Sequence, residues 1–459
     1  MSLGMKNTNS TFSSLGWYPW APVFLFASYW TVALVCYHIG PIVYPVFYLK
    51  TYIFIGFSLG LFFAGYKLGL GFVFARTPEE ISELSGNFRS AITFLKITTI
   101  SSLIGIAGLV VDRFISGAAS IDKTLNNVDV VRDDLILTPL TTISNLFYLP
   151  VLISLALFMY CLKVRWKVPL WVHASVCITA LMACFLAFLG AERQAFLFVA
   201  EYIFFYLFFL KNERLSTLIY DRTYRAWRIA FLAFLTIASI YIFFIARYRS
   251  TDGYLDHLTR NRWAQLDRYH LLADNTWFNE RQMGSVFLLA SYMTDELEIA
   301  DKYCKASSPF CFNPGLLFGD RVWFQVKRFD PEYVCDAYGI IDELDSELSD
   351  GSWSDKWKGI FGCNLVMFGC VGGILFMGIL GIVFGFMVRQ FLLYYDAWCL
   401  IIVLCLYLCL TMSYMGFYAD IFHLAGLAVG LMHYLFAPKS LRPDRRQRKR
   451  VRDTAVGLA

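Results

Sequence analysis

The sequence predicts an all-α, polytopic membrane protein, and three observations support this fold class. Of the 459 residues, 58% are hydrophobic and only 16% are charged, whereas soluble globular chains carry about 25% charged residues. The mean hydropathy is high, at +0.54. The apolar residues fall in runs of about 20, the length at which a helix crosses the hydrocarbon core of a bilayer. This composition excludes a cytosolic enzyme, a disordered chain and a nucleic-acid-binding protein.

About ten apolar segments are expected to cross the membrane as helices, with ends placed to within about four residues. In chain order they are 20–40, 51–71, 92–111, 142–162, 168–189, 192–211, 228–246, 364–388, 397–416 and 418–437. Glycine pairs four residues apart, at Gly65/Gly69, Gly381/Gly385 and Gly426/Gly430, are typical of close packing between membrane helices.

Basic residues predict the orientation, because Lys and Arg collect in short cytoplasmic loops. They gather at 163–167, at 211–228 and in the tail at 442–452. With ten spans these three clusters lie on one side, so both termini are expected in the cytoplasm. The predicted organisation is spans one to seven in 1–246, a large outer loop in 247–357, spans eight to ten in 358–437 and a basic cytoplasmic tail in 438–459.

The large outer loop is expected to be partly helical, since 255–273 and 285–300 show helical spacing of apolar residues. It also contains Cys304 and Cys311. In an oxidising compartment these two could form a small-loop disulfide; the sequence leaves the disulfide and two free thiols equally open.

Several arginines are expected where helices leave the membrane on the outer side. Arg193, beside Glu192, lies at the outer end of span 192–211, and Arg247 and Arg249 follow span 228–246. Charged residues at the membrane boundary are costly and are often functional. The alternative is that Arg193 only anchors its helix at the interface, with its charged end in the headgroup layer.

The turn between the last two spans brings three further polar side chains to the same level. These are Tyr418, Asp420 and His423. Asp420 and His423 are three residues apart and therefore share one helical face. A histidine in such a place is more often packed and hydrogen-bonded than reactive, so both interpretations of His423 stay open.

Outward-facing guanidinium groups at the level of lipid headgroups favour a pyrophosphate ligand, because Arg offers a fixed, always charged fork of donors. Such groups would stabilise a departing diphosphate without a metal. The sequence has no zinc or nucleotide-binding motif, and no metal or cofactor is expected. Candidate substrate-binding residues on the outer side are Arg247, Tyr418, Asp252, Arg260, Arg268, His270, Arg281 and Arg321.

Three stretches of the chain resemble the Wzy-type O-antigen polymerases. The run at 190–209, GAERQAFLFVAEYIFFYLFF, is similar to a span of that family that begins Gly-Ser-Arg-Gly, although Ala191 and Glu192 stand where Gly-Ser is common. The long, mixed-charge outer loop is the second likeness. The third is Asn364 to Gly372, which resembles an N…FG..G opening of the following span. The resemblance covers about 190–390.

The resemblance implies a GT-C-like, metal-independent glycosyltransferase of the bacterial inner membrane, with its active site facing the periplasm. Its substrates would be undecaprenyl-pyrophosphate-linked repeat units, and its partners the bilayer, a chain-length regulator and a flippase, with no nucleic acid. Arg193 matches the family arginine that meets the donor pyrophosphate, and Arg249 is the next best match. The motif does not fix a general base for the acceptor hydroxyl; the candidates on the outer side are His423, Asp420, Asp252 and His270.

Two other functions remain open at this point. An O-antigen ligase would transfer the same glycan to a lipid A core and would share the architecture and the outer arginines. A repeat-unit flippase or other transporter would place charged residues in the middle of several spans and would have short loops. The spans here are nearly free of charge at their centres, which favours the polymerase.

Overall fold

The computed structural model describes residues 18–39, 46–72, 78–115, 150–163, 168–189, 297–312, 359–394 and 397–411, together with a few positions within 140–147, 236–240, 294 and 428–432. All regular secondary structure in these ranges is helical, which confirms the all-α prediction there. The helices are η1 (Tyr18–Trp20), α2 (Ala21–Ile39), α3 (Leu49–Gly71), α4 (Pro78–Ile115), α8 (Val151–Lys163), α9 (Leu170–Leu189), α17 (Gly359–Tyr394) and α18 (Ala397–Thr411), and a short helix spans 297–306.

Within the described ranges, four helices are long and apolar enough to cross a membrane. The segments are Pro22–Ile39, Leu49–Gly71, Ala91–Asp112 and Gly359–Leu392, and shorter apolar helices occupy Leu170–Ala183 and Ala397–Leu410. The four segments agree with the first three expected spans and with the eighth, so the chain has the character of a membrane-spanning helical protein. The expected spans 192–211, 228–246 and 418–437 lie almost entirely outside the described residues.

Helix α4 is much longer than the span 92–111 expected for it, because it already begins at Pro78. Its added first turns read PEEISELSGNFRS, with proline at the first helical position and two glutamates directly after it. Proline fits that position and acidic side chains favour a helix N-terminus. The apolar run at 92–111 therefore predicted only the part of α4 that is apolar enough to lie in lipid.

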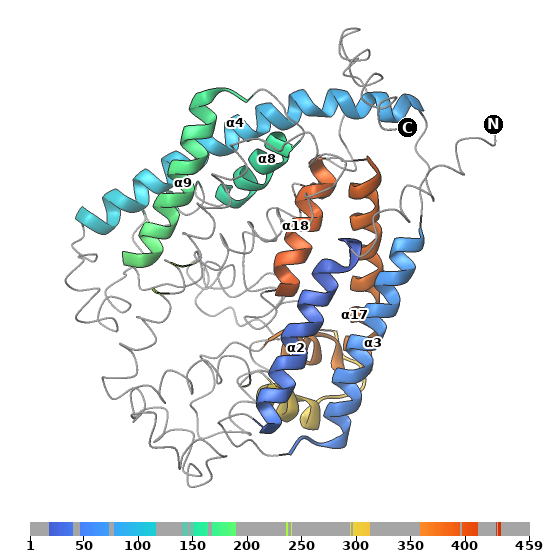
Figure 1. Cartoon of the computed structure of the whole chain (residues 1–459). Helices are drawn as coiled ribbons and strands as arrows, with labels where there is room; N and C mark the ends of the chain where they lie inside the picture. The colour runs from blue at the N-terminus through green and yellow to red at the C-terminus, as the bar shows by residue number, and fades with distance from the viewer. Residues whose placement is uncertain are drawn as a thin grey trace.

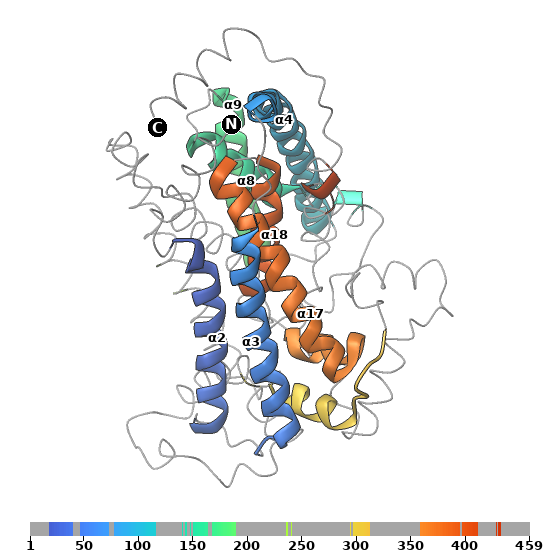
Figure 2. The same ribbon diagram turned by 90° about the vertical axis from the view of Figure 1, so that its right-hand side faces the viewer.

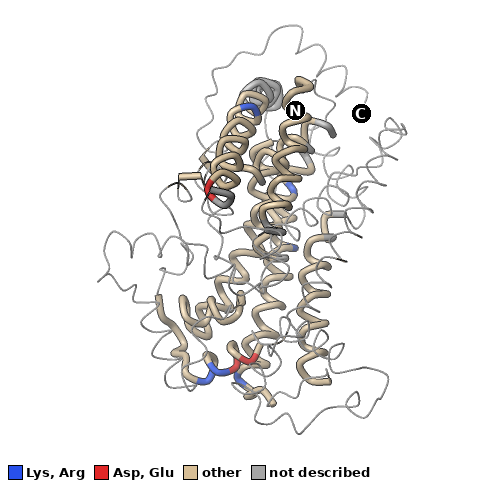
Figure 3. The backbone as a smooth tube through the Cα atoms, turned by 90° about the vertical axis from the view of Figure 1, so that its left-hand side faces the viewer, with Lys and Arg blue, Asp and Glu red and all other residues tan. Residues whose placement is uncertain are grey.

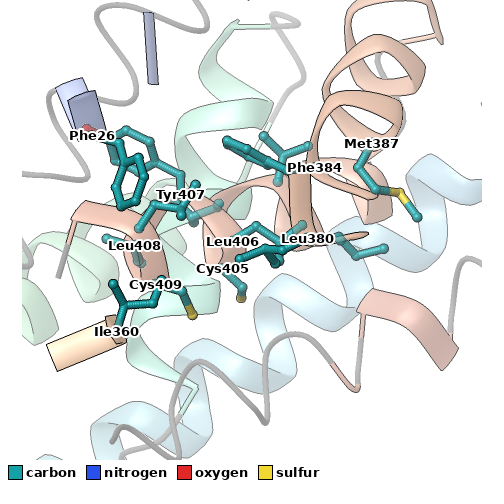
Figure 4. Close-up of a cluster of buried hydrophobic side chains, with 14 of the residues drawn as sticks. Phe26, Ile360, Leu380, Phe384, Met387, Cys405, Leu406, Tyr407, Leu408 and Cys409 are labelled. Carbon is teal, nitrogen blue, oxygen red and sulfur yellow. The ribbon is translucent and has the colours of Figure 1, made fainter. Parts of the chain in front are cut away.

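The helices form two groups (Figures 1 and 2). In the first, α2, α3, α17 and α18 lie lengthwise beside one another, and α17 packs against both α3 and α18. In the second, α4, α8 and α9 pack against one another, and α18 connects the groups through its contacts with α8 and α4. The first group encloses an apolar cluster to which α2 contributes Phe26, α17 contributes Phe384 and α18 contributes Tyr407 (Figure 4).

Helices α3 and α17 are held together by a glycine seam, which we define as Gly65 and Gly69 of α3 with Gly381 and Gly385 of α17. A Cβ atom on any of the four would overlap backbone atoms of the opposite helix. Gly65 faces Gly378 and Gly69 faces Ile382, so the two helices run in the same direction. The seam confirms that these two glycine pairs pack helices, and the parallel direction agrees with the expected topology, in which both spans enter from the outer side.

Candidate functional site

A buried carboxylate from the long loop caps the beginning of α3. Asp301, on helix 297–306, is 5% exposed. Its Oδ1 atom accepts hydrogen bonds from the Thr51 hydroxyl at 2.5 Å and from the Tyr48 backbone N–H at 3.0 Å. The first N–H groups of a helix lack partners within the helix, and a negative charge is favoured there. Asp301 therefore attaches helix 297–306 to the start of α3 across a sequence separation of 250 residues.

Lysine side chains surround this cap. The Lys50 ammonium donates to the Ser307 carbonyl at 2.9 Å, and the Lys305 ammonium lies 4.8 Å from the centre of the Tyr48 ring. The interaction with Tyr48 raises the pKa of Lys305. Lys302 forms an ion pair with Glu298 at 3.1 Å. Figure 3 shows basic and acidic residues close together at this end of α3. We call it the capped end and define it by Tyr48, Lys50, Thr51, Asp301 and Lys305.

Helix α17 is broken ten residues after its first residue. Gly369 has φ +73° and ψ −176°, a conformation that is essentially restricted to glycine. The backbone N–H groups after the break are bound by the chain that follows helix 297–306: Cys370 donates to the Ser308 carbonyl at 3.0 Å and Val371 to the Pro309 carbonyl at 2.8 Å. In the other direction, the Cys311 N–H donates to the Phe368 carbonyl at 3.1 Å.

This exchange of hydrogen bonds explains how a break can persist in an apolar helix. Irregular backbone is tolerated at membrane depth only where protein or water satisfies its polar groups. Segment 308–311 does so here. A Cβ atom at Gly369 would come within 3.0 Å of the Ser308 and Pro309 carbonyls and of the Phe310 Cα atom, so glycine is required for close approach as well as for its backbone conformation.

The two loop cysteines do not pair with each other. The Cys304 sulfur lies 3.5 Å from the Cys370 sulfur, and the Cys311 thiol donates to the Val366 carbonyl at 3.2 Å. All of these thiols are free in the structure. Burial, and then the bond to Cys370, raises the pKa of the Cys304 thiol to about 12, and burial also raises the pKa of the Cys311 thiol. In this structure Cys304 and Cys311 are thus two free thiols, each with a different neighbour on α17.

The opposite ends of α3 and α17 are built differently. Arg389 is buried and donates from its guanidinium to the Leu70 carbonyl, near the last residue of α3. The neighbouring Gln390 side chain is also buried, and neither atom of its amide has a partner among the described residues. The bond from Arg389 satisfies one of the last carbonyls of α3, so the beginning of α3 is bonded to Asp301 of the long loop and its end to Arg389 of α17.

None of the twelve predicted site residues lies in the part of the chain that the structure describes. They are Arg193, Arg247, Arg249, Asp252, Arg260, Arg268, His270, Arg281, Arg321, Tyr418, Asp420 and His423. Sequence reasoning missed Asp301 and Thr51, which the structure brings together. The available signal for Asp301 was an aspartate at the end of the apolar helical pattern in 285–300.

Comparisons with known proteins give no family. No protein-family model matches the chain, and neither a curated protein nor a solved structure matches it. Within the described ranges, no group of three His, Cys, Asp or Glu side chains is placed to hold a metal ion.

Proposed function

We propose that the chain is a membrane glycosyltransferase that polymerises undecaprenyl-pyrophosphate-linked oligosaccharide repeat units on the outer face of a bacterial cytoplasmic membrane. The observation that carries the proposal furthest is the attachment of the long loop to the bundle. Segment 297–312, from the loop that contains most of the candidate arginines, is bonded to the start of α3 and to the break in α17. That break lies within Asn364 to Gly372, the stretch that resembles the polymerases.

The attachment matters because a long loop must be held near the bilayer if its arginines are to meet a lipid pyrophosphate. The capped end fixes the middle of the loop at the end of the bundle where α3 and α17 begin. It also presents the exposed side chains of Lys50 and Lys305 there. Cations at the headgroup level attract anionic lipid headgroups. Both features favour a diphosphate-bearing lipid as the substrate.

In the proposed reaction, the anomeric carbon of the donor glycan forms a bond to a hydroxyl oxygen at the non-reducing end of the acceptor repeat unit. The bond between that carbon and the pyrophosphate oxygen breaks, and undecaprenyl pyrophosphate leaves. Arg193 and Arg249 stabilise the charge that develops on the leaving group. The acceptor proton passes to a general base, for which His423, Asp420, Asp252 and His270 are the candidates.

The proposal is tested by reconstituting the purified protein in liposomes with a single lipid-linked repeat unit. A ladder of longer glycans on a polysaccharide gel is expected from the wild-type protein. Arg193→Ala should leave only the single repeat while the protein stays folded in the membrane, with a rate loss of about a hundredfold or more for a lost transition-state contact. Arg222→Ala, on the expected cytoplasmic side, is the matched control and should keep the ladder.

Two results would contradict the proposal. A wild-type ladder from Arg193→Ala removes this arginine from the mechanism. Transfer of the glycan to a lipid A core, with no extension of the repeat, identifies a ligase in place of a polymerase.

A further inference from the structure

Two thiols from distant parts of the chain meet where the long loop contacts the break in α17. Cys304 lies on helix 297–306 and is fully buried, and Cys370 directly follows Gly369 and is 8% exposed. Their sulfur atoms are 3.5 Å apart across a sequence separation of 66 residues. At this distance, small rotations of the two side chains would bring the sulfurs within bonding distance, about 2.05 Å.

The backbone around the two thiols is fixed on both sides. The Cys370 N–H donates to the Ser308 carbonyl at 3.0 Å, four residues after Cys304. On the other side of Cys304, Asp301 is bonded to the start of α3. The sulfurs are therefore held together by the fold itself and not by a chance approach of two mobile side chains.

We propose that Cys304 and Cys370 form a disulfide bond in the mature protein. The proposal rests on the outward orientation contained in the proposed function, since disulfides persist in the oxidising compartments outside the cytoplasm, but it does not require glycosyl transfer. In the reaction the two thiols lose two protons and two electrons and the S–S bond forms. A disulfide of a thiol–disulfide oxidoreductase accepts both electrons and both protons and is reduced to a dithiol.

The third thiol nearby is placed to remain free. Cys311 donates to the Leu365 and Val366 carbonyls at 3.7 and 3.2 Å, so its sulfur is directed at backbone oxygen atoms. Cys304 and Cys311 lie close in sequence, but the sulfur that the structure places 3.5 Å from Cys304 is that of Cys370 on α17. The cross-link would thus join two elements of the fold and would not merely close a small loop.

The bond would hold segment 308–311 over the break. Ser308 and Pro309 supply the carbonyls that bind the N–H groups of Cys370 and Val371. A cross-link one residue after Gly369 would keep these two carbonyls close to the N–H groups that they bind. Because only a thiolate attacks a disulfide, and burial suppresses thiolate formation at Cys304, we expect the bond to form while helix 297–306 docks, when the two thiols have met and solvent still reaches them. Once formed, it should resist reductants until the protein is unfolded.

The test measures the state of the thiols in the full-length protein in its membrane. Cells are quenched in acid, free thiols are blocked with N-ethylmaleimide, and non-reduced peptides are analysed by mass spectrometry. The expected result is a peptide in which Cys304 is linked to Cys370, in most of the wild-type protein and in Cys311→Ser. It should be absent from Cys304→Ser, in which Cys370 should carry the maleimide.

Two outcomes would overturn the proposal: alkylated Cys304 and Cys370 in most wild-type chains, or a link from Cys304 to Cys311. A second host with an oxidising cytoplasm separates the causes. If the link forms only in that host, this end of the bundle faces inward and the orientation in the proposed function fails too. If the pair stays reduced in both hosts, the disulfide alone is wrong and the proposed function stands.

Discussion

The glycine seam and the capped end both attach α3 to another part of the chain, to α17 and to helix 297–306 respectively, but by different means. At the seam, Gly65, Gly69, Gly381 and Gly385 bring the backbones of α3 and α17 into direct contact. Close packing of backbones is a main source of helix association in lipid, where the solvent is as apolar as the side chains. At the capped end, one carboxylate and one lysine satisfy specific backbone and hydroxyl groups. Added volume at the seam should therefore lower the stability of the protein. At the capped end, stability should instead fall when a hydrogen-bonding group is removed.

The largest effect is expected from added volume in the seam. In Gly381→Leu the new side chain would overlap the Phe62 carbonyl and the Tyr66 backbone nitrogen. Backbone atoms within a helix cannot move aside, so we expect a loss of about 3 kcal/mol or more and little folded protein. The measurement is the yield and melting temperature of detergent-solubilised protein. Gly60→Leu is the control, since a Cβ atom there has no neighbour within 4 Å; equal loss in both variants would mean that the seam is not tightly packed.

A smaller loss is expected at the break in α17. Gly369→Ala forces a residue with a Cβ atom into a backbone conformation with φ +73° and against the Ser308 and Pro309 carbonyls. The cost should be about 2 kcal/mol, measured as a lower melting temperature. The matched variant is Gly71→Ala at the end of α3, where a Cβ atom meets nothing within 4 Å. If Gly369→Ala were as stable as Gly71→Ala, the break would not be part of the folded protein.

The smallest of the three effects concerns a single hydroxyl at the capped end. Thr51→Val keeps the shape of the side chain but removes the donor to Asp301, and should cost about 1–2 kcal/mol because the carboxylate stays buried. Among the described residues, the Thr98 hydroxyl bonds only to the Leu95 carbonyl of its own helix, at 3.1 Å, so Thr98→Val should be close to neutral. The melting temperatures of the two variants are compared, and that of Thr51→Val should be the lower. Identical values would show that the Thr51–Asp301 bond contributes nothing to stability.

The same contrast explains what could be predicted from the sequence. The four membrane-length helices of the described ranges and the seam follow from local patterns: apolar runs of sufficient length, and glycines four residues apart. The capped end depends on Asp301 and Thr51 meeting across 250 residues, and no periodicity within either segment specifies that contact. The positive φ of Gly369 and the approach of Cys304 to Cys370 likewise depend on tertiary packing. The twelve predicted site residues lie outside the described residues and stay predictions.

The capped end must face the outside of the cell if the proposed chemistry is to take place there. Lys305→Cys places a thiol at an exposed position of this end, and Phe72→Cys places one at an exposed position just beyond the opposite end of α3. Each variant is treated in intact cells with a maleimide that cannot cross the membrane, and labelling is compared with the wild-type protein and with permeabilised cells. We predict that Lys305→Cys is labelled from outside and that Phe72→Cys is labelled only after permeabilisation. The reverse pattern would contradict the outward-facing site and the proposed chemistry with it.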